Sequence, residues 1–233
     1  MRQRKLTEVR EVEMKVIENP KDSDWNKFWG RGESLQFSQV SWSKRRILEV
    51  LKPYVLAGQK ALDAGCGSGF FSRFFCEHGM QTTAVDYSRQ ALELAAQIAG
   101  DRVKFIKADM LNTPFPEVLP DKFNLIFSDG LFEHFTPQDQ DRILRNFISV
   151  LSPQGVVVTF VPNRWSPWEL IRPFFMPGID EIPFVLPALV DLHRRNGLDV
   201  IASGGVNTLP FRLSPEKFLA RHFGMLLYTV AKK

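Results

Sequence analysis

Residues 60–71 read KALDAGCGSGFF: an apolar stretch that ends in the acid Asp63, a glycine-rich segment, and two phenylalanines. The apolar stretch predicts a buried strand, and the phenylalanines predict the start of a helix. Three glycines stand at alternate positions, 65, 67 and 69. They allow a tight turn and a close approach of the backbone to a ligand, because no Cβ stands in the way. The following helix points unpaired N–H groups back at this loop, so we predict a strand–loop–helix unit that holds a nucleoside-like ligand.

The chain has 233 residues, 44% of them hydrophobic, and a formal net charge of +4. Its length predicts a single domain over residues 1–233, and its charge permits an anionic partner without requiring one. We expect no transmembrane segment and no ordinary signal peptide, because apolar runs of about 18 residues are absent and the basic N-terminus leads into charged residues. Cys66 and Cys76 make a poor disulfide pair, which favours a cytoplasmic location.

Strand and helix patterns alternate along the chain. Strands are predicted over residues 60–64, 81–85, 103–107, 123–128, 155–161, 198–203 and 225–231. Helices are predicted over residues 69–78, 88–99, 136–151, 187–196 and 215–222, and the proline-rich segment 114–120 is expected to be a loop. Ser88 and Thr136 are the predicted N-caps of their helices. The alternation predicts an α/β fold, with a parallel sheet covered on both faces, and the two late strands fit a hairpin at the sheet edge.

Residues 1–52 are predicted to form an N-terminal helical cap. Residues 1–22 fit a short helix or a poorly ordered arm, and helices are expected over residues 23–30 and 41–52. The helix expected over residues 23–30 carries two tryptophans and a phenylalanine. Two interpretations are open for it: it folds over a ligand, or it packs on the core.

Residues 162–187 are rich in proline and aromatic side chains and are too long for a plain connection. They separate a core at residues 53–161 from a closing helix and strands at residues 188–233. We predict an aromatic lid insertion that walls an apolar substrate. Its candidate side chains, together with one from the N-terminal cap, are Trp29, Trp165, Trp168 and Phe175. The alternative is a loop packed on the edge of the domain.

The glycine loop has its acid two residues before the first glycine, a spacing that differs from the dinucleotide pattern G-x-G-x-x-G. It resembles motif I of the class I methyltransferases that depend on S-adenosylmethionine (SAM). The likeness extends over about residues 60–163 and is closest to small-molecule enzymes of quinone biosynthesis, through the Glu133–His134 pair and the segment VLSPQG at 150–155. It implies a Rossmann-like sheet of seven strands, mostly parallel, with helices on both faces and an antiparallel last strand.

The resemblance also implies a SAM site. In the family, acids after the second and third strands bind the ribose and the adenine, and the segment after the fourth strand faces the methyl group. The residues that match are Asp63, Ala64, Gly65, Cys66, Gly67, Gly69, Phe70, Asp86, Tyr87, Asp109, Met110, Ser128, Asp129 and Gly130. Structural alternatives stay open for the three strand-end acids, since Asp63 could bond loop N–H groups, Asp86 could cap a helix, and Asp109 could be a turn residue.

The implied activity is in-line transfer of a methyl group from SAM to an O, N or C atom of an apolar or aromatic small molecule. His134 is the candidate general base, because imidazole accepts protons near neutral pH. Its alternative role is packing at a helix start, and Glu133 and Asp129 are weaker candidates. The sequence indicates no metal-ligand cluster, and we expect a monomer or homodimer.

Two other function classes remain. The arginine-rich start favours an RNA or protein methyltransferase. Against it, residues 128–131 read SDGL, where many nucleic-acid amino methyltransferases have Asn/Asp-Pro-Pro-aromatic, and no RNA-binding module is recognisable. The other class is a SAM-binding scaffold without activity.

Overall fold

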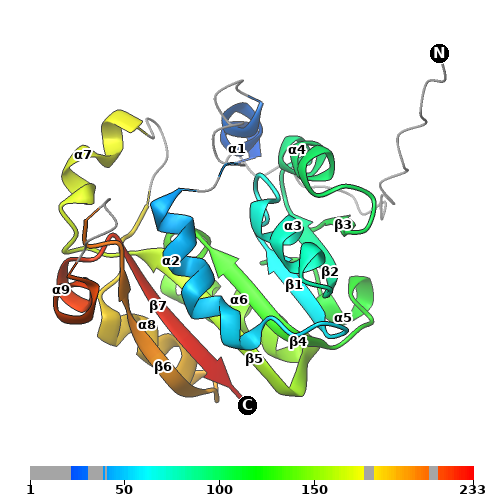
Figure 1. Ribbon diagram of the computed structural model, residues 1–233. Helices are drawn as coiled ribbons and strands as arrows, with labels where there is room; N and C mark the ends of the chain where they lie inside the picture. Colours follow the sequence, from blue (N-terminus) through cyan, green and yellow to red (C-terminus); the bar gives the residue numbers. More distant parts are fainter. Residues whose placement is uncertain (1–21, 31–38, 40, 176–180, 210–214) are drawn as a thin grey trace.

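The computed structural model describes residues 22–30, 39, 41–175, 181–209 and 215–233, and the arm predicted before residue 22 lies outside this part of the chain. Figure 1 shows a twisted sheet through the centre of the molecule, with helices in front of it and behind it. The strands of the sheet are β1 (Lys60–Ala64), β2 (Gln81–Asp86), β3 (Lys104–Lys107), β4 (Phe123–Asp129), β5 (Leu151–Pro162), β6 (Asp199–Val206) and β7 (Leu226–Lys232).

The seven strands lie in the order β3-β2-β1-β4-β5-β7-β6. Neighbours from β3 to β5 are parallel, whereas β7 is antiparallel to both β5 and β6. The predicted fold class, a mostly parallel seven-stranded sheet with an antiparallel last strand, is confirmed. The late strands do pair at the sheet edge, but the last strand inserts between β5 and β6, so that β6 becomes the edge strand.

The helices surround this sheet. They are α1 (Asp22–Trp29), α2 (Trp42–Leu51), η2 (Lys52–Tyr54), α3 (Phe70–Glu77), α4 (Arg89–Ala99), α5 (Phe115–Val118), η3 (Phe132–His134), α6 (Pro137–Val150), α7 (Trp168–Phe175), α8 (Leu186–Arg195) and α9 (Glu216–Phe223). The predicted caps are confirmed: Ser88 Oγ accepts a hydrogen bond from Ala91 N, and Thr136 Oγ1 accepts one from Asp139 N. Residues 114–120 differ from the predicted loop, because residues 115–118 form the short helix α5 after Pro114.

The sheet has a separate apolar cluster on each face. On one face, Phe71 and Phe75 of α3 pack with side chains of α2 around Phe127 of β4. On the other face, Phe147 of α6 and Leu189 of α8 pack against side chains of β1, β4 and β5. Because the central strands are buried on both faces, they are mostly apolar, as in residues 155–161 of β5.

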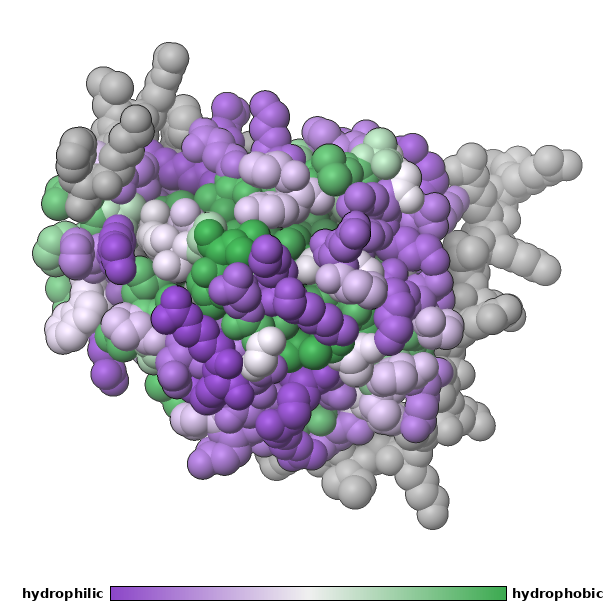
Figure 2. Space-filling view, turned by 90° about the horizontal axis from the view of Figure 1, so that it is seen from below, coloured by the Kyte–Doolittle hydropathy of each residue, from purple (hydrophilic) through white to green (hydrophobic). Residues whose placement is uncertain are grey.

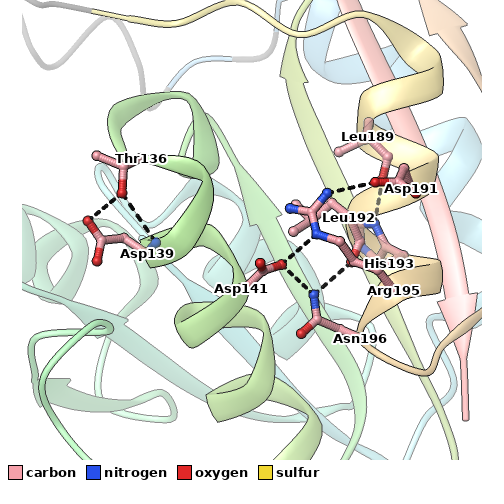
Figure 3. A network of polar contacts seen from close by, with 9 residues as sticks. All are labelled: Thr136, Asp139, Asp141, Leu189, Asp191, Leu192, His193, Arg195 and Asn196. Carbon is pink, nitrogen blue, oxygen red and sulfur yellow. Dashed lines mark hydrogen bonds and ion pairs between the residues drawn. The ribbon is translucent and has the colours of Figure 1, made fainter.

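Polar contacts hold α6 and α8 side by side (Figure 3). Asp141 Oδ1 accepts hydrogen bonds from Arg195 Nε at 2.8 Å and from Asn196 Nδ2 at 2.6 Å. Arg195 also pairs with Asp191 of its own helix. The neighbouring His193 is fully buried, and burial lowers its pKa to about 4, so it packs as a neutral side chain. These contacts fix the layer behind the sheet and lie apart from the pocket described below.

The end of the molecule opposite α1 is mostly hydrophilic, with apolar residues showing between the polar ones (Figure 2). Among the helices of the described ranges, none combines the length and apolar character that crossing a membrane requires. The apolar surface that matters for a ligand lies in a pocket near α1.

Candidate functional site

A pocket of about 630 Å³ opens at the carboxyl ends of the parallel strands. Residues at the ends of four neighbouring strands line it: Asp63 (β1), Asp86 (β2), Asp109 (after β3) and Asp129 (β4). The crevice at the carboxyl ends of the strands is where open α/β sheets bind ligands. The structure therefore brings together the four acidic positions that the sequence analysis had placed at strand ends.

The glycine loop forms one wall of this pocket. Gly65, Gly67 and Gly69 have φ values of +77°, +48° and +74°, a region that other residues rarely adopt. Gly65 N and Cys66 N both donate to Val85 O, which ties the loop to the end of β2. Gly69 lies away from the pocket, since a Cβ built on it would come within 2.7 Å of Ala95. The glycines thus serve two purposes: two expose the loop backbone to the pocket, and the third lets α3 approach α4.

Asp86 connects the second strand to the glycine loop. Its Oδ2 accepts a hydrogen bond from Gly67 N and its Oδ1 accepts one from Ser88 N, both at 2.9 Å. The bond to Ser88 N supports the turn before α4, but the N-cap of that helix is Ser88, so Asp86 is not its cap. A carboxylate has about four acceptor positions, so two remain for a ligand. Burial raises its pKa to about 6, against the two backbone hydrogen bonds, which lower it.

Asp63 is only 2% exposed, and its Oδ2 accepts a hydrogen bond from Ser72 Oγ at 2.5 Å. Burial raises its pKa to about 7, and the charges of Asp86 and Asp129 add to the increase. The alternative in which Asp63 bonds loop N–H groups is not what the structure shows, since its partner is a side chain of α3. Asp63 therefore lies between the loop and α3, and its charge changes near neutral pH.

Asp109 is both a turn residue and a pocket residue. Its Oδ1 accepts hydrogen bonds from Leu111 N and Asn112 N, and its Oδ2 accepts one from Asn112 Nδ2. The turn that it closes presents Met110 to the pocket wall. The turn and pocket interpretations of Asp109 are thus compatible.

The segment after β4 contributes Asp129 and Gly130 to the pocket, whereas Ser128 is fully buried and does not line it. Ala64 is likewise buried in the sheet and absent from the wall. Burial raises the pKa of Asp129 to about 7, and the charge of Lys44 opposes the increase. The sequence analysis missed Lys44, a pocket residue of α2 whose Nζ lies 4.2 Å from the centre of the Phe70 ring.

Helix α1 covers the pocket from above the loop. Trp29, predicted as part of a substrate lid, lines the pocket and lies against Gly67: a Cβ on Gly67 would stand 2.6 Å from Trp29 Cζ2. Trp25, one turn earlier, makes an edge contact with His134, with ring centroids 4.9 Å apart. Asn26 between them accepts a hydrogen bond from Ser88 Oγ at 2.8 Å. The two tryptophans therefore contact different residues of the pocket wall, Gly67 and His134.

His134 lies in the pocket beside two carboxyl groups. Its Nε2 is 3.9 Å from Glu133 Oε1. Glu133, His134 and Glu181 each have one atom that could bind a metal ion, and these three atoms lie within 4.8 Å of one another. Glu181 comes from the segment before α8, which is held here by a hydrogen bond from Ile182 N to Glu133 O at 2.8 Å. The sequence analysis recognised no such cluster, because its third member is distant in the chain.

The segment predicted as an aromatic lid divides in two. Trp168 lines the pocket together with Arg172 of α7, whereas Trp165 is 66% exposed and does not line it. The turn before α7 explains the difference, because Asn163 Oδ1 accepts from Trp165 N and Ser166 Oγ accepts from Trp168 N. The side chain of Phe175 lies outside the described part of the structure.

Comparisons with known proteins agree with this geometry. Residues 61–155 match the model of a family described as a methyltransferase domain. An uncharacterized methyltransferase of Geobacillus kaustophilus is 29% identical over 141 residues, which is 60% of this chain and 63% of that protein. A ubiquinone biosynthesis O-methyltransferase of Pseudomonas fluorescens is 28% identical over 154 residues, covering 64% of this chain and 60% of that protein. The chain thus spans about three fifths of the length of these relatives.

Among solved structures, the N-methyltransferase NodS of Bradyrhizobium japonicum, in complex with S-adenosylhomocysteine, has a TM-score of 0.67. The match covers 92% of this chain and 99% of NodS at 14% identity. At that identity the comparison establishes a shared fold.

Proposed function

We propose that the chain is a SAM-dependent methyltransferase that transfers a methyl group from SAM to a small molecule bound in the pocket at the strand ends. One observation carries the proposal: the glycine loop and four strand-end acids, predicted separately from the sequence, line one pocket. Its volume of about 630 Å³ is within the range of small-molecule sites.

The residues present fit SAM by their donor and acceptor chemistry. Asp86 keeps two acceptor positions for ribose hydroxyls after its bonds to Gly67 N and Ser88 N. Asp109 and Met110 offer an acceptor and an apolar side chain for an adenine ring. Gly65 leaves the loop backbone open, because a Cβ there would meet nothing closer than 3.5 Å. Asp63 and Asp129 lie where they suit a cationic amino group.

Bound SAM supplies an electrophilic methyl group on sulfur, which an acceptor attacks in line while the methyl–sulfur bond breaks. The protein's tasks are to align the acceptor and to exclude water. We assign the proton transfer from the acceptor to His134, whose side chain lines the pocket beside Glu133. Trp25, Trp29 and Trp168 cover the pocket from α1 and α7. We infer from this cover that residues 1–52 and 162–187 act as a cap and a lid on one domain.

The test is thermal unfolding of the chain with S-adenosylhomocysteine, SAM and NAD⁺ in parallel. A ligand at about 100 times its Kd adds roughly 2.7 kcal/mol of stability, a shift of a few degrees. We expect the shift with the first two ligands and its loss in Asp86→Asn. The control is Asp101→Asn, which removes an exposed carboxylate outside the pocket. A shift with NAD⁺ alone would refute the proposal, and strong, salt-dependent tRNA binding would favour an RNA substrate instead.

A further inference from the structure

Resting on the proposed methyl transfer, we propose that the acceptor is an amine whose cationic head binds between Glu133 and Glu181. The same pocket is lined by the glycine loop and by these two carboxyl groups, together with His134.

Glu133 is a buried acid with an unused acceptor. It is 1% exposed, and its Oε2 accepts no hydrogen bond from any described residue. Burial raises its pKa well above the ordinary value, and the nearby charges of Glu181, Asp129 and Glu169 raise it further. A buried polar atom without a partner is costly, so its presence on a pocket wall indicates a ligand that supplies a donor.

Glu181 likewise has a buried carboxylate oxygen that accepts no hydrogen bond from the described residues. This oxygen is Oε2, and Arg172 Nε lies 3.4 Å from it. The Nε–H of Arg172 donates instead to Glu169 Oε2. The backbone bond between Ile182 and Glu133 holds Glu181 close to Glu133, so two acceptors with free capacity face one space.

The charges around this space leave room for a cation. The carboxyl groups of Glu133, Glu169 and Glu181 interact with one another. The guanidinium of Arg172 lies within ion-pair distance of Glu169 and of Glu181. Adding one positive charge in a buried site reduces the repulsion among the carboxylates, whereas an anionic acceptor would increase it.

Aromatic side chains favour an organic cation over a bare metal ion. Trp25 contacts the ring of His134, and Trp168 lines the same pocket. Aromatic faces attract ammonium groups and pack against the attached carbon chain.

The chemistry balances with the groups present. Glu133 is a carboxylate when the ammonium binds beside it, because the positive charge offsets the effect of burial on its pKa, and the ammonium then gives one proton to this carboxylate. The freed nitrogen lone pair forms the bond to the methyl carbon, and the electrons of the broken carbon–sulfur bond stay on sulfur. The second proton leaves the methylated nitrogen through His134 to water. No oxidant or metal is required.

The test is equilibrium binding of 2-phenylethylamine to the protein loaded with S-adenosylhomocysteine, at pH 7.5. Its neutral analogue 2-phenylethanol is the paired probe. We expect the amine to bind at least about tenfold more tightly than the alcohol, and Glu133→Gln and Glu181→Gln to remove that preference. Both replacements keep the side-chain shape and remove buried charge, so the variants should fold. Glu117→Gln, at an exposed position of α5, is the matched control and should behave as the wild type.

Three results would each overturn the proposal: equal affinity for the amine and the alcohol, no binding of the amine at about 10 mM, or an unchanged preference for the amine in both variants. Manganese chloride alone is the third probe: stoichiometric Mn²⁺ binding that Glu133→Gln and Glu181→Gln abolish would replace the amine with a divalent cation. Binding of S-adenosylhomocysteine should be the same in all these variants. If that ligand binds and the amine does not, the amine assignment fails while the proposed methyl transfer stands.

Discussion

The indole of Trp29 lies directly on Gly67, so that a Cβ built on this glycine would be 2.6 Å from Trp29 Cζ2 and 2.7 Å from Cη2. Gly67 also has a φ of +48° and donates its N–H to Asp86. The cap helix α1 and the glycine loop therefore fit together only while residue 67 has no side chain. This contact is the most direct structural link between the N-terminal cap and the proposed cofactor site in the pocket.

We predict that Gly67→Ala weakens binding of S-adenosylhomocysteine about tenfold or more and lowers the free energy of unfolding by more than about 1 kcal/mol. Two causes act together, the unfavourable positive φ and the collision with Trp29. Calorimetric titration and urea unfolding measure the two effects.

Gly100→Ala separates these causes, because Gly100 also has a positive φ of +74° but has no atom within 4 Å of its built Cβ. This control should show the backbone cost alone, with unchanged ligand affinity. Adding Trp29→Ala should recover part of the stability lost in Gly67→Ala. Equal losses in the two glycine variants would mean that the Trp29 contact has no energetic weight.

Asp63 should make stability depend on pH in a defined direction. Its pKa is raised from 3.8 to about 7, mainly by burial, so the folded state holds the proton more tightly than the unfolded chain. Below about pH 4 the group is protonated in both states. As the pH rises from about 4 to 7, only the unfolded chain ionises, and the protein loses stability, by roughly 2 to 4 kcal/mol in total.

Asp63→Asn removes this titration, so its stability relative to the wild type should increase between pH 5 and pH 8. Urea unfolding at the two pH values measures the difference, and the other titrating groups cancel because both proteins contain them. Asp101→Asn, at an exposed position, is the control. Parallel pH profiles for Asp63→Asn and the wild type would contradict the prediction.

Arg46 should stabilise the fold through an ion pair with Glu216, outside the pocket. Its side chain is buried, forms a 2.9 Å ion pair with Glu216 of α9, and donates to Leu209 O at 2.7 Å and Asn207 Oδ1 at 3.2 Å. We predict that Arg46→Met costs about 3 kcal/mol or more, because it leaves the Glu216 carboxylate without its cation.

Arg46→Met combined with Glu216→Gln should recover much of this loss, and Arg45→Met, at the exposed neighbouring position, should have little effect on urea unfolding. If the double variant is no more stable than Arg46→Met, the hydrogen bonds to the backbone and to Asn207, rather than the charge pair, account for the cost.

The strand-end acids could be predicted from the sequence because each one is fixed locally. Asp63, Asp86 and Asp129 stand at the ends of buried strands, and parallel strands end at one edge of a sheet. The helix starts at Ser88 and Thr136 were predictable for the same reason, since a cap bonds N–H groups within its own turn.

The part of the pocket around Glu133 and Glu181, where we propose that the acceptor binds, could not be predicted, because it depends on contacts between distant segments. The position of Glu181 is set by the hydrogen bond from Ile182 N to Glu133 O, and neither residue has a sequence pattern that predicts it. Lys44 reaches the pocket only because α2 packs on α3 and β4. The insertion of β7 between β5 and β6 is likewise a choice among pairings that apolar strands alone leave open.

For Trp165 and Trp168 too, the sequence did not predict which side chain reaches the pocket. Both were candidates for the lid, but Trp168 lines the pocket, whereas Trp165 is 66% exposed and absent from its wall. We predict that Trp168→Ala lowers methyl transfer about tenfold or more, since it removes an apolar wall from the proposed acceptor site, and that Trp165→Ala leaves the rate within about twofold. S-adenosylhomocysteine should bind equally to both variants, because the tryptophan that packs on Gly67 of the glycine loop is Trp29 of α1. The measurement is the rate of S-adenosylhomocysteine release with a saturating amine acceptor, beside calorimetric affinity for S-adenosylhomocysteine. A larger loss in Trp165→Ala than in Trp168→Ala would mean that the exposed turn before α7, and not its pocket face, governs the acceptor.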